Sequence, residues 1–480
     1  MRQRCKCVTL ECRSNKDSAN RKIAKTPVTS IFYFLVAATG PNLPGVAFCS
    51  VSACRRTRIL PKTIMPSVSR RSFLLQSSTV VSGLMLTNAS GNSAVPPATR
   101  PLGSEAVRSD VGSLYPFIES QTVKADFPLS FLNARFKNLK RWKQTAREKF
   151  LELLHYSPPR CDPAPEVVER VDRGDYVREK IYFNTTPSIR VPAYLLLPKN
   201  ARGKSPAIVA LHDHGGFYLW GKEKLVETDD EAPALKNWRT TYYGGNALAS
   251  VLVRMGYVVL VIDMFYWGER RMLMPDDAAD WRERPADISR ERIAAFNQRA
   301  SQNEQLVGRT IFAAGFTWAG VMFWDDIRSV DYLLTRPEVD LQRIGCVGLS
   351  VGGLRAAHLA ALDPRVKAAV AVGWMASFPA QLQRHIRNTI GHTKIVPGLY
   401  RFMDYPDVAS LAMPSALLVI NGSKDGLFEP GGVATAFDKL ARCYKKAGIP
   451  DRIKTSLYDA PHEFNGDMQQ EAWAWLKRWV

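Results

Sequence analysis

The chain has 480 residues, of which 46% are hydrophobic and 23% are charged, and its formal net charge is +20. These proportions are typical of a globular protein with roughly two or three domains, and they exclude collagen-like, coiled-coil and wholly disordered chains. Residues 1–100 hold 15 Lys and Arg against two acidic residues, so the other 380 residues carry a net charge of only +7. This nearly balanced charge, without a basic stripe, argues against a nucleic-acid partner.

The first recognisable pattern lies at residues 65–95. An arginine pair, Arg70-Arg71, precedes a mildly apolar stretch over 73–86 and a run of small residues. This order is that of an export signal, and SRRSFL resembles the twin-arginine type, which the Tat export machinery reads. We therefore expect a signal peptide at 65–95, upstream sequence or a disordered leader at 1–64, and a periplasmic or extracellular mature protein. The apolar stretch is too short and too polar for a stable membrane span.

The next segment, residues 96–175, is interpreted as an N-terminal helical segment and linker. Apolar residues recur at helical spacing between about 126 and 155, which predicts one or two helices. A cluster of prolines then marks the linker: Pro158, Pro159, Pro163 and Pro165.

From residue 176 to 480 the sequence alternates between short apolar runs rich in β-branched residues and helical or mixed stretches. The runs predict about eight strands: Val177–Phe183, Arg190–Leu197, Ala207–His212, Tyr257–Asp263, Arg343–Leu349, Val366–Val372, Ala416–Asn421 and Ile453–Tyr458. The first two are close enough for a hairpin, whereas the longer separations require crossover connections. The pattern therefore predicts an α/β domain with a mostly parallel sheet flanked by helices.

The most informative motif follows the predicted strand Arg343–Leu349. There the sequence reads GLSVG over 348–352, and the residues after it have helical character. A G-x-S-x-G motif between a strand and a helix is typical of a nucleophile elbow, whose turn is so tight that only glycines fit beside the serine. The motif indicates Ser350 as a catalytic nucleophile. The other interpretation is an ordinary turn in which the serine caps the helix.

A serine nucleophile needs a base, and the base needs an acid to orient it. Of the seven histidines, only His462 follows the last predicted strand, as the chain order serine, acid, histidine requires. Asp425 follows the preceding strand through a glycine-containing turn and is the preferred acid. Glu429 is the alternative.

The oxyanion of the transition state needs hydrogen-bond donors. One is expected to be the backbone N–H of Val351, the residue after the serine. The second is expected from the glycine-rich loop HDHGG at 212–216. We favour the N–H of His214, with Gly215 or Gly216 as alternatives.

Cofactors are not expected from the sequence. His212 and His214 also permit a metal interpretation, since alternate residues of a strand share a face, but no further cluster of ligands follows them. No G-x-G-x-x-G follows a strand, and no G-x-x-x-x-G-K-[ST] motif occurs.

Several segments together are similar to the α/β-hydrolase superfamily, and more narrowly to exported bacterial hydrolases grouped with dienelactone hydrolases and acetyl xylan esterases. They are VALHDHGG (209–216), VLVIDMFYWGER (259–270), GLSVGG (348–353), NGSKDGLF (421–428) and APHEF (460–464). The resemblance covers about residues 126–480 and implies an α/β-hydrolase fold with a Ser350–His462–Asp425 triad. Dienelactone hydrolases have a cysteine where Ser350 stands, which favours ordinary ester cleavage here. The usual His-Gly of the oxyanion loop is replaced by His212-Asp213.

Two further features are expected to border the site. Residues 271–317 form a long insertion before the helix that leads to the elbow strand, and we interpret it as a lid or, alternatively, as a surface excursion. Trp267, just after the strand Tyr257–Asp263, is a candidate wall of the pocket.

The sequence thus predicts an exported serine esterase for a small-molecule or carbohydrate ester, such as acetylated xylan. Two alternatives are an exported serine peptidase on the same scaffold and a non-catalytic, hydrolase-like binding protein. A peptidase of this type would normally carry a further domain, and no repeat region is visible to supply one. A binding protein has no reason to keep serine, acid and histidine in order.

Overall fold

The computed structural model describes residues 108–480. The predicted leader at 1–64 and the predicted signal peptide at 65–95 lie outside the described residues.

The described chain begins with short helices and irregular segments that precede the sheet. They are η1 (Gly112–Leu114), α1 (Tyr115–Ser120) and, after irregular chain, α2 (Leu139–Leu154). The expected helical stretch 126–155 is therefore a single helix in its second part only. Phe127, Phe131 and Phe136 are buried as well, but they lie in turns and irregular chain before this helix. The Asn138 side chain accepts a hydrogen bond from a backbone N–H of the first turn and so fixes the start of α2.

A nine-stranded mixed sheet forms the centre of the fold. The strands are β1 (Glu166–Asp172), β2 (Tyr176–Thr186), β3 (Ile189–Pro198), β4 (Ser205–Leu211), β5 (Val258–Ile262), β6 (Val339–Leu349), β7 (Val366–Val372), β8 (Ala416–Gly422) and β9 (Ile453–Tyr458). Their order is β1-β2-β3-β5-β4-β6-β7-β8-β9. In this order, the first three pairs (β1 with β2, β2 with β3, and β3 with β5) are antiparallel, and the five pairs from β5 with β4 onward are parallel. The predicted fold class, the hairpin and all eight predicted strands are confirmed.

The ninth strand, β1, lies in the segment that the sequence assigned to a linker. Its side chains are exposed or half-buried, and four of its seven residues are charged. A strand at the sheet edge that faces solvent carries no apolar run, so the pattern that found the other strands could not find this one.

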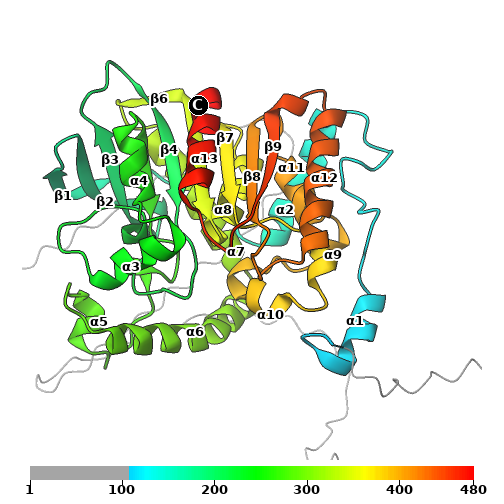
Figure 1. Cartoon of the computed structure of the whole chain (residues 1–480), viewed down its shortest axis with the longest axis horizontal. Coiled ribbons are helices and arrows are strands. Elements are labelled where there is room, and N and C mark those ends of the chain that lie inside the picture. Colours follow the sequence, from blue (N-terminus) through cyan, green and yellow to red (C-terminus); the bar gives the residue numbers. More distant parts are fainter. Residues whose placement is uncertain (1–107) are drawn as a thin grey trace, which may run out of the picture. The chain divides into compact units, whose positions relative to one another are not determined.

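Helices cover both faces of the sheet, and each face has its own apolar core (Figure 1). On one face lie α4 (Leu248–Arg254) and α13 (Gly466–Trp479), and on the other lie α2, α7 (Trp318–Leu333), α8 (Val351–Leu362) and α11 (Tyr405–Ser410). α12 (Pro430–Lys446) packs against α11 and β9. Strands buried on both faces, such as β5, are apolar throughout, as burial from two sides requires.

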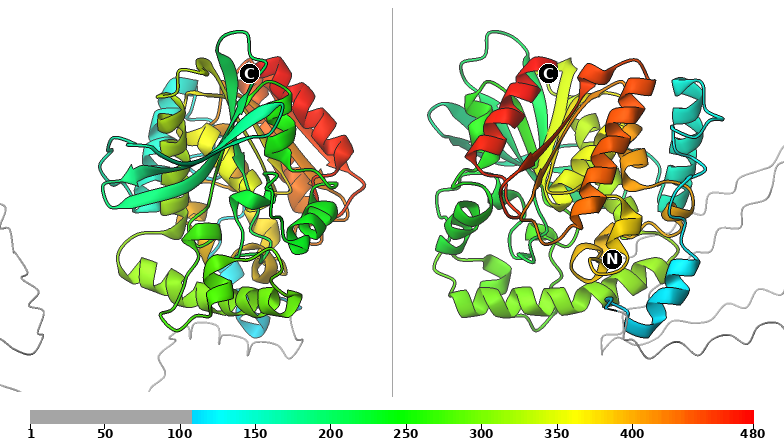
Figure 2. Two further views of the ribbon diagram at one scale, coloured as in Figure 1. Left: turned by 90° about the vertical axis from the view of Figure 1, so that its left-hand side faces the viewer. Right: turned by 45° about the vertical axis from the view of Figure 1, so that its right-hand side comes forward.

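The remaining elements lie in the connections between the strands. They are η2 (Lys222–Lys224), α3 (Pro233–Tyr242), η3 (Gly268–Arg270), α5 (Ala279–Glu283), α6 (Arg290–Ala313), α9 (Phe378–Gln381), α10 (Ile386–Thr389), η4 (His392–Lys394), η5 (Leu399–Arg401) and η6 (Pro450–Arg452). The predicted insertion at 271–317 contains α5 and α6. Figures 1 and 2 show α6 lying across the edge of the molecule where the parallel strands end.

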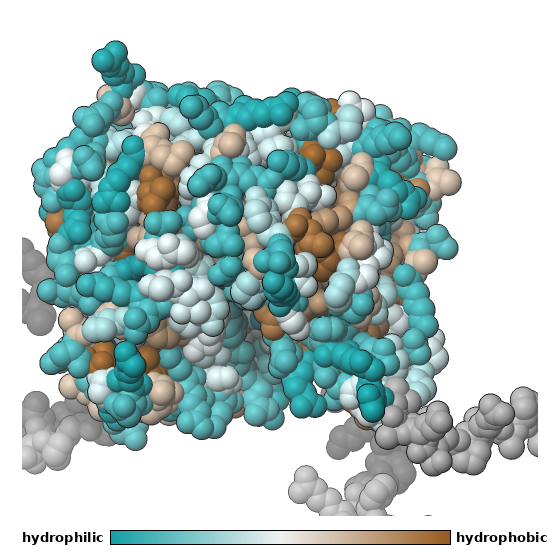
Figure 3. Space-filling view, viewed as in Figure 1, coloured by the Kyte–Doolittle hydropathy of each residue, from teal (hydrophilic) through white to brown (hydrophobic). Residues whose placement is uncertain are grey.

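The face seen in Figure 3 is mostly hydrophilic, with small apolar patches. Among residues 108–480, no single helix is long and apolar enough to cross a membrane. Only α6 and α7 counted together, with an 84° bend between them, meet that length and composition.

Candidate active site

The elbow is built as the sequence motif predicts. β6 ends at Leu349, α8 begins at Val351, and Ser350 between them has φ 60° and ψ −124°, a conformation that residues other than glycine rarely adopt. A Cβ added at Gly352 would lie 2.0 Å from the carbonyl oxygen of Leu211, and one added at Gly348 would lie 2.5 Å from the same oxygen. Only glycine therefore fits on either side of the serine, because the end of β4 packs directly against the turn.

The histidine and the acid come from the ends of the last two strands, beyond β7. His462 follows β9 and Asp425 follows β8, and the imidazole Nδ1 lies 2.6 Å from the carboxylate Oδ2. Asp425 is buried, and its other oxygen accepts a hydrogen bond from the N–H of Leu427 at 3.0 Å. Glu429, the alternative acid, instead caps α12 by accepting the N–H of Gly432 at 2.6 Å. Of the two acids considered, Asp425 is the one that contacts the imidazole.

Ser350 and His462 line one cavity of about 440 Å³ at the carboxyl edge of the sheet. One wall of the cavity is the loop after β4, with Asp213, His214, Gly215 and Gly216. An aromatic and apolar wall is formed by Trp238, Tyr242, Leu349, Trp374 and Leu427. A polar wall is formed by Asn388, Thr389 and Lys394. Serine, imidazole and the glycine-rich loop thus face the same space. The assignment of Ser350, His462 and Asp425 as a catalytic triad stays a prediction.

The loop after β4 presents backbone N–H groups to this cavity. Within the described chain, no hydrogen bond uses the N–H of His214 or of Val351. The N–H of Gly216, by contrast, donates to Nδ1 of the His214 ring at 3.0 Å. Positive φ angles of 54° at Gly215 and 67° at Gly216 allow the loop this path. The N–H of Gly215 likewise has no acceptor within the described chain, so His214 and Gly215 both remain candidates for the second donor, and Gly216 does not.

The His214 ring connects the loop to the insertion. Because Nδ1 accepts the Gly216 N–H, the proton is on Nε2, which donates to Oε1 of Glu304 on α6 at 2.7 Å. Burial and the positive charge of Lys394 lower the pKa of His214, so the ring is neutral. The hydroxyl of Tyr218 donates to the same Glu304 oxygen at 2.9 Å. Sequence reasoning did not find Glu304, because the insertion lacks a motif that refers to the loop.

His212 does not share a ligand position with His214. Its Nδ1 contacts the carbonyl oxygen of Asp213 at 2.8 Å, and its Nε2 accepts the N–H of Met264 at 3.1 Å. Burial holds its pKa well below the usual value. All four ring nitrogens of the two histidines thus take part in hydrogen bonds within the chain, and the rings hold the loop in place.

Asp213, which stands where a glycine is usual, is a buried and well-partnered carboxylate. It accepts hydrogen bonds from the hydroxyl of Tyr243 at 2.5 Å and from the indole of Trp238 at 3.3 Å, and it pairs with Nζ of Lys224 at 3.1 Å. Burial raises the pKa of Asp213, but Lys224 and these hydrogen bonds outweigh burial and hold the pKa below its usual value. The carboxylate therefore anchors the oxyanion loop to α3 and η2.

Trp267 is not a wall of the cavity, contrary to expectation. Its side chain is fully buried, its indole N–H donates to the carbonyl oxygen of His214 at 3.2 Å, and its ring packs edge-on against the imidazole. It supports the loop from behind. The aromatic walls come from Trp238 and Trp374, which no sequence pattern singled out.

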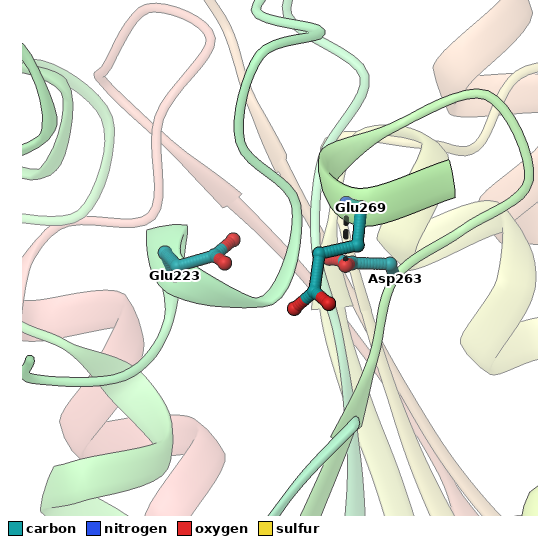
Figure 4. A group of neighbouring side chains, drawn as sticks. All are labelled: Glu223, Asp263 and Glu269. Atoms are coloured by element: carbon teal, nitrogen blue, oxygen red, sulfur yellow. Dashed lines mark hydrogen bonds between the residues drawn. The ribbon is translucent and has the colours of Figure 1, made fainter. Parts of the chain in front are cut away.

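Three carboxylates near β5 converge as metal ligands do. Glu223, Asp263 and Glu269 each offer an oxygen within 4.8 Å of the others (Figure 4). Nζ of Lys222 lies among them, at 3.1, 2.8 and 2.6 Å. Burial lowers the pKa of Lys222, but the surrounding carboxylates outweigh it and keep the ammonium charged. The lysine ammonium occupies the position between the carboxylates that a metal ion would take. The cluster joins η2 to the loop after β5.

Comparison with known proteins places the chain in a family. A model of the Abhydrolase family matches residues 108–471, and the chain belongs to this family. The Bacillus subtilis protein “Putative hydrolase YtaP” is 25% identical over 334 residues, which cover 70% of this chain and 98% of that protein. The α/β-hydrolase resemblance seen in the sequence is confirmed.

Two solved structures share the fold. A “putative acetyl xylan esterase” of Bacteroides fragilis has a TM-score of 0.56 at 18% identity and covers 72% of this chain and 82% of its own. A glucuronoyl esterase of Solibacter usitatus has a TM-score of 0.50 at 15% identity and covers 75% of this chain and 99% of its own.

Proposed function

We propose that this member of the Abhydrolase family is a serine hydrolase that cleaves carboxylic esters. One observation carries the proposal: Ser350 and His462 line one cavity, and His462 is paired with Asp425, so that three separate strand ends contribute to the site. The backbone N–H groups of Val351, His214 and Gly215, beside this cavity, have no acceptor within the described chain. This is the set of groups that acyl transfer requires.

The reaction begins with attack of the Ser350 Oγ on the ester carbonyl carbon, while Nε2 of His462 takes the serine proton. Asp425 holds Nδ1–H of the ring, so that Nε2 is free to accept, and it stabilises the imidazolium. The carbonyl oxygen becomes an oxyanion, which the N–H groups of Val351 and His214 bind.

The C–O bond to the alcohol then breaks, and the imidazolium gives its proton to the leaving alkoxide. An acyl-enzyme remains on Ser350. A water molecule, deprotonated by His462, attacks the acyl carbon, and the acid is released as the serine regains its proton.

Labelling with a fluorophosphonate probe tests the nucleophile. Wild-type protein is expected to gain one adduct on the peptide that contains Ser350, and Ser350→Ala and heat-unfolded wild-type protein are expected to gain none. An intact, folded protein without an adduct would exclude the serine mechanism and leave a binding protein.

A substrate panel separates esterase from peptidase. p-Nitrophenyl esters of increasing chain length are compared with acetylated xylan and with peptide p-nitroanilides. We expect ester cleavage, and we propose carbohydrate esters as substrates because similarly folded proteins carry esterase names. Preference for the anilides would favour the peptidase alternative.

We also propose that the protein is exported, on the strength of the twin-arginine pattern around Arg70-Arg71. Mass spectrometry of the N-terminus after secretion is expected to find it downstream of residue 65. An N-terminus upstream of Met65 would contradict the signal.

A further inference from the structure

Lys394 brings an unpaired cation to the proposed active-site cavity. It ends η4, in the connection between β7 and β8, and lines the same cavity as Ser350 and His462. Its Nζ donates to the hydroxyl of Thr393 at 3.5 Å and lies 5.9 Å from the centre of the Trp374 ring, and within the described chain no carboxylate lies within 4 Å of it. The nearby lysines differ, because Lys222 and Lys224 are each paired with buried carboxylates.

Within the described chain no carboxylate pairs directly with Lys394, although Glu304 acts on its charge from a greater distance. Asp213, the one acidic residue of the lining, is neutralised by Lys224. The charge of Glu304 acts on Lys394, since its Oε2 and the lysine Nζ lie 3.4 and 3.7 Å from where a Cβ of Gly391 would be, but the two groups form no ion pair within 4 Å. The other oxygen of Glu304, Oε1, accepts hydrogen bonds from Tyr218 and from the neutral His214 ring, and Glu304 does not line the cavity.

The Lys394 side chain is partly buried. Burial lowers the pKa of Lys394 to about 8, with Glu304 opposing the shift. At neutral pH most molecules therefore carry a charge there that has no directly paired carboxylate, and an anionic ligand in the cavity would supply that partner.

We propose that Lys394 determines substrate specificity by binding a carboxylate, so that the ester cleaved at Ser350 carries a second, free carboxylate on its acid or alcohol part. The inference rests on the proposed function, because it assumes that the cavity binds an ester. Hemiesters of dicarboxylic acids and acylated hydroxy acids have this chemistry.

Matched pairs of substrates test the proposal and locate the carboxylate. On the acid side, monomethyl succinate is compared with methyl 4-methylpentanoate, in which an isopropyl group replaces the carboxylate. On the alcohol side, 4-acetoxybenzoate is compared with 4-acetoxybenzamide. The quantity measured is the ratio of kcat/KM for the charged ester to that for the neutral one.

We expect wild-type protein to prefer the charged member of at least one pair. Lys394→Met is expected to lower that ratio roughly tenfold to a hundredfold, the usual worth of a hydrogen bond to a charged group. Lys394→Arg is expected to keep most of it. Lys236→Met, which removes an exposed charge on α3, the helix that contributes Trp238 and Tyr242 to the cavity, is the matched control and should leave the ratio unchanged.

A binding measurement keeps the two proposals separable. Succinamate and 4-methylpentanamide are uncleaved analogues, and their binding is followed by tryptophan fluorescence, since Trp238 and Trp374 line the cavity. Lys394-dependent binding of succinamate without cleavage of any ester would support the carboxylate-binding role of Lys394 and overturn the proposed function. Ester cleavage with no charge preference in wild-type protein would do the reverse. If Lys394→Met does not fold, Lys394→Gln replaces it, and the wild-type preference alone can still refute the inference.

Discussion

Replacement of Asp425 by asparagine tests the proposed charge arrangement at a single atom. In the structure, one Asp425 oxygen accepts the Leu427 N–H and the other faces Nδ1 of His462. In Asp425→Asn the amide oxygen keeps the bond to Leu427, so the NH₂ group points at the imidazole. Nδ1 must then accept, and the ring proton moves to Nε2, the nitrogen that has to take the serine proton.

Two losses combine in this variant. A charge-assisted hydrogen bond is worth about 1.5–3 kcal/mol, which is a loss of roughly tenfold to a hundredfold in rate. The wrong tautomer adds to it by removing the base. We expect kcat/KM for p-nitrophenyl acetate to fall by about 10³-fold or more, with an unchanged thermal unfolding curve.

Glu429→Gln is the matched control, since Glu429 was the alternative acid and caps α12 instead. Its activity is expected to stay within about twofold of wild type, with at most about 1 kcal/mol lost in the free energy of unfolding. Asp425→Asn protein that keeps more than a tenth of the wild-type kcat/KM, or a large loss in Glu429→Gln, would refute the assignment.

Three further predictions concern stability and are read by urea unfolding. Gly352→Ala places a Cβ 2.0 Å from the carbonyl oxygen of Leu211 at the end of β4 and is expected to lower the free energy of unfolding by about 1–3 kcal/mol. Gly466→Ala, with open space around the added Cβ, should leave the free energy of unfolding unchanged. Equal effects of the two substitutions would contradict the tight elbow. Burial lowers the pKa of His358 to about 4 from its ordinary 6.5, so the unfolded chain binds the proton more readily. The contribution of this group to the free energy of unfolding is then full above pH 6.5 and is lost as the pH falls toward 4, with a loss of about 2 kcal/mol between pH 7 and 5. His358→Phe should reduce the pH dependence of the free energy of unfolding by that amount. An unchanged pH dependence would refute the burial argument. Asp326→Asn leaves the fully buried guanidinium of Arg355 without its anion and is expected to cost about 3–5 kcal/mol; a cost below about 1 kcal/mol would show that the pair is not needed.

The strands and their ends could be predicted because burial leaves a direct mark on the sequence. A strand such as β5, covered on both faces, must be apolar at every position, so its limits are visible. Parallel strands then bring their carboxyl ends to one edge, and this alone makes Ser350, Asp425 and His462 neighbours from positions far apart in the chain. β1 left no such mark, because its side chains face solvent.

The walls of the site could not be predicted in the same way. Trp267 follows a strand end and was expected to face the cavity, but the chain turns it into the core behind the oxyanion loop. Lys394, which lines the cavity, and Glu304, which contacts His214, lie in connections between strands. These connections have no fixed alignment with the strands of the sheet. Their positions depend on how those connections fold over its edge, which no local periodicity records.

The insertion at 271–317 contacts the loop after β4 through Glu304 on α6. The N–H proposed to bind the oxyanion belongs to His214, and the ring of that residue is held by the Gly216 N–H on one side and by Glu304 of α6 on the other. Displacing α6 would leave the buried Nε2–H without an acceptor, at a cost of about 1–3 kcal/mol. It would also free the ring to rotate, so that the loop would lose an anchor beside its donor. The position of α6 and the conformation of the loop after β4 are therefore coupled through the hydrogen bond between Nε2 of His214 and Glu304.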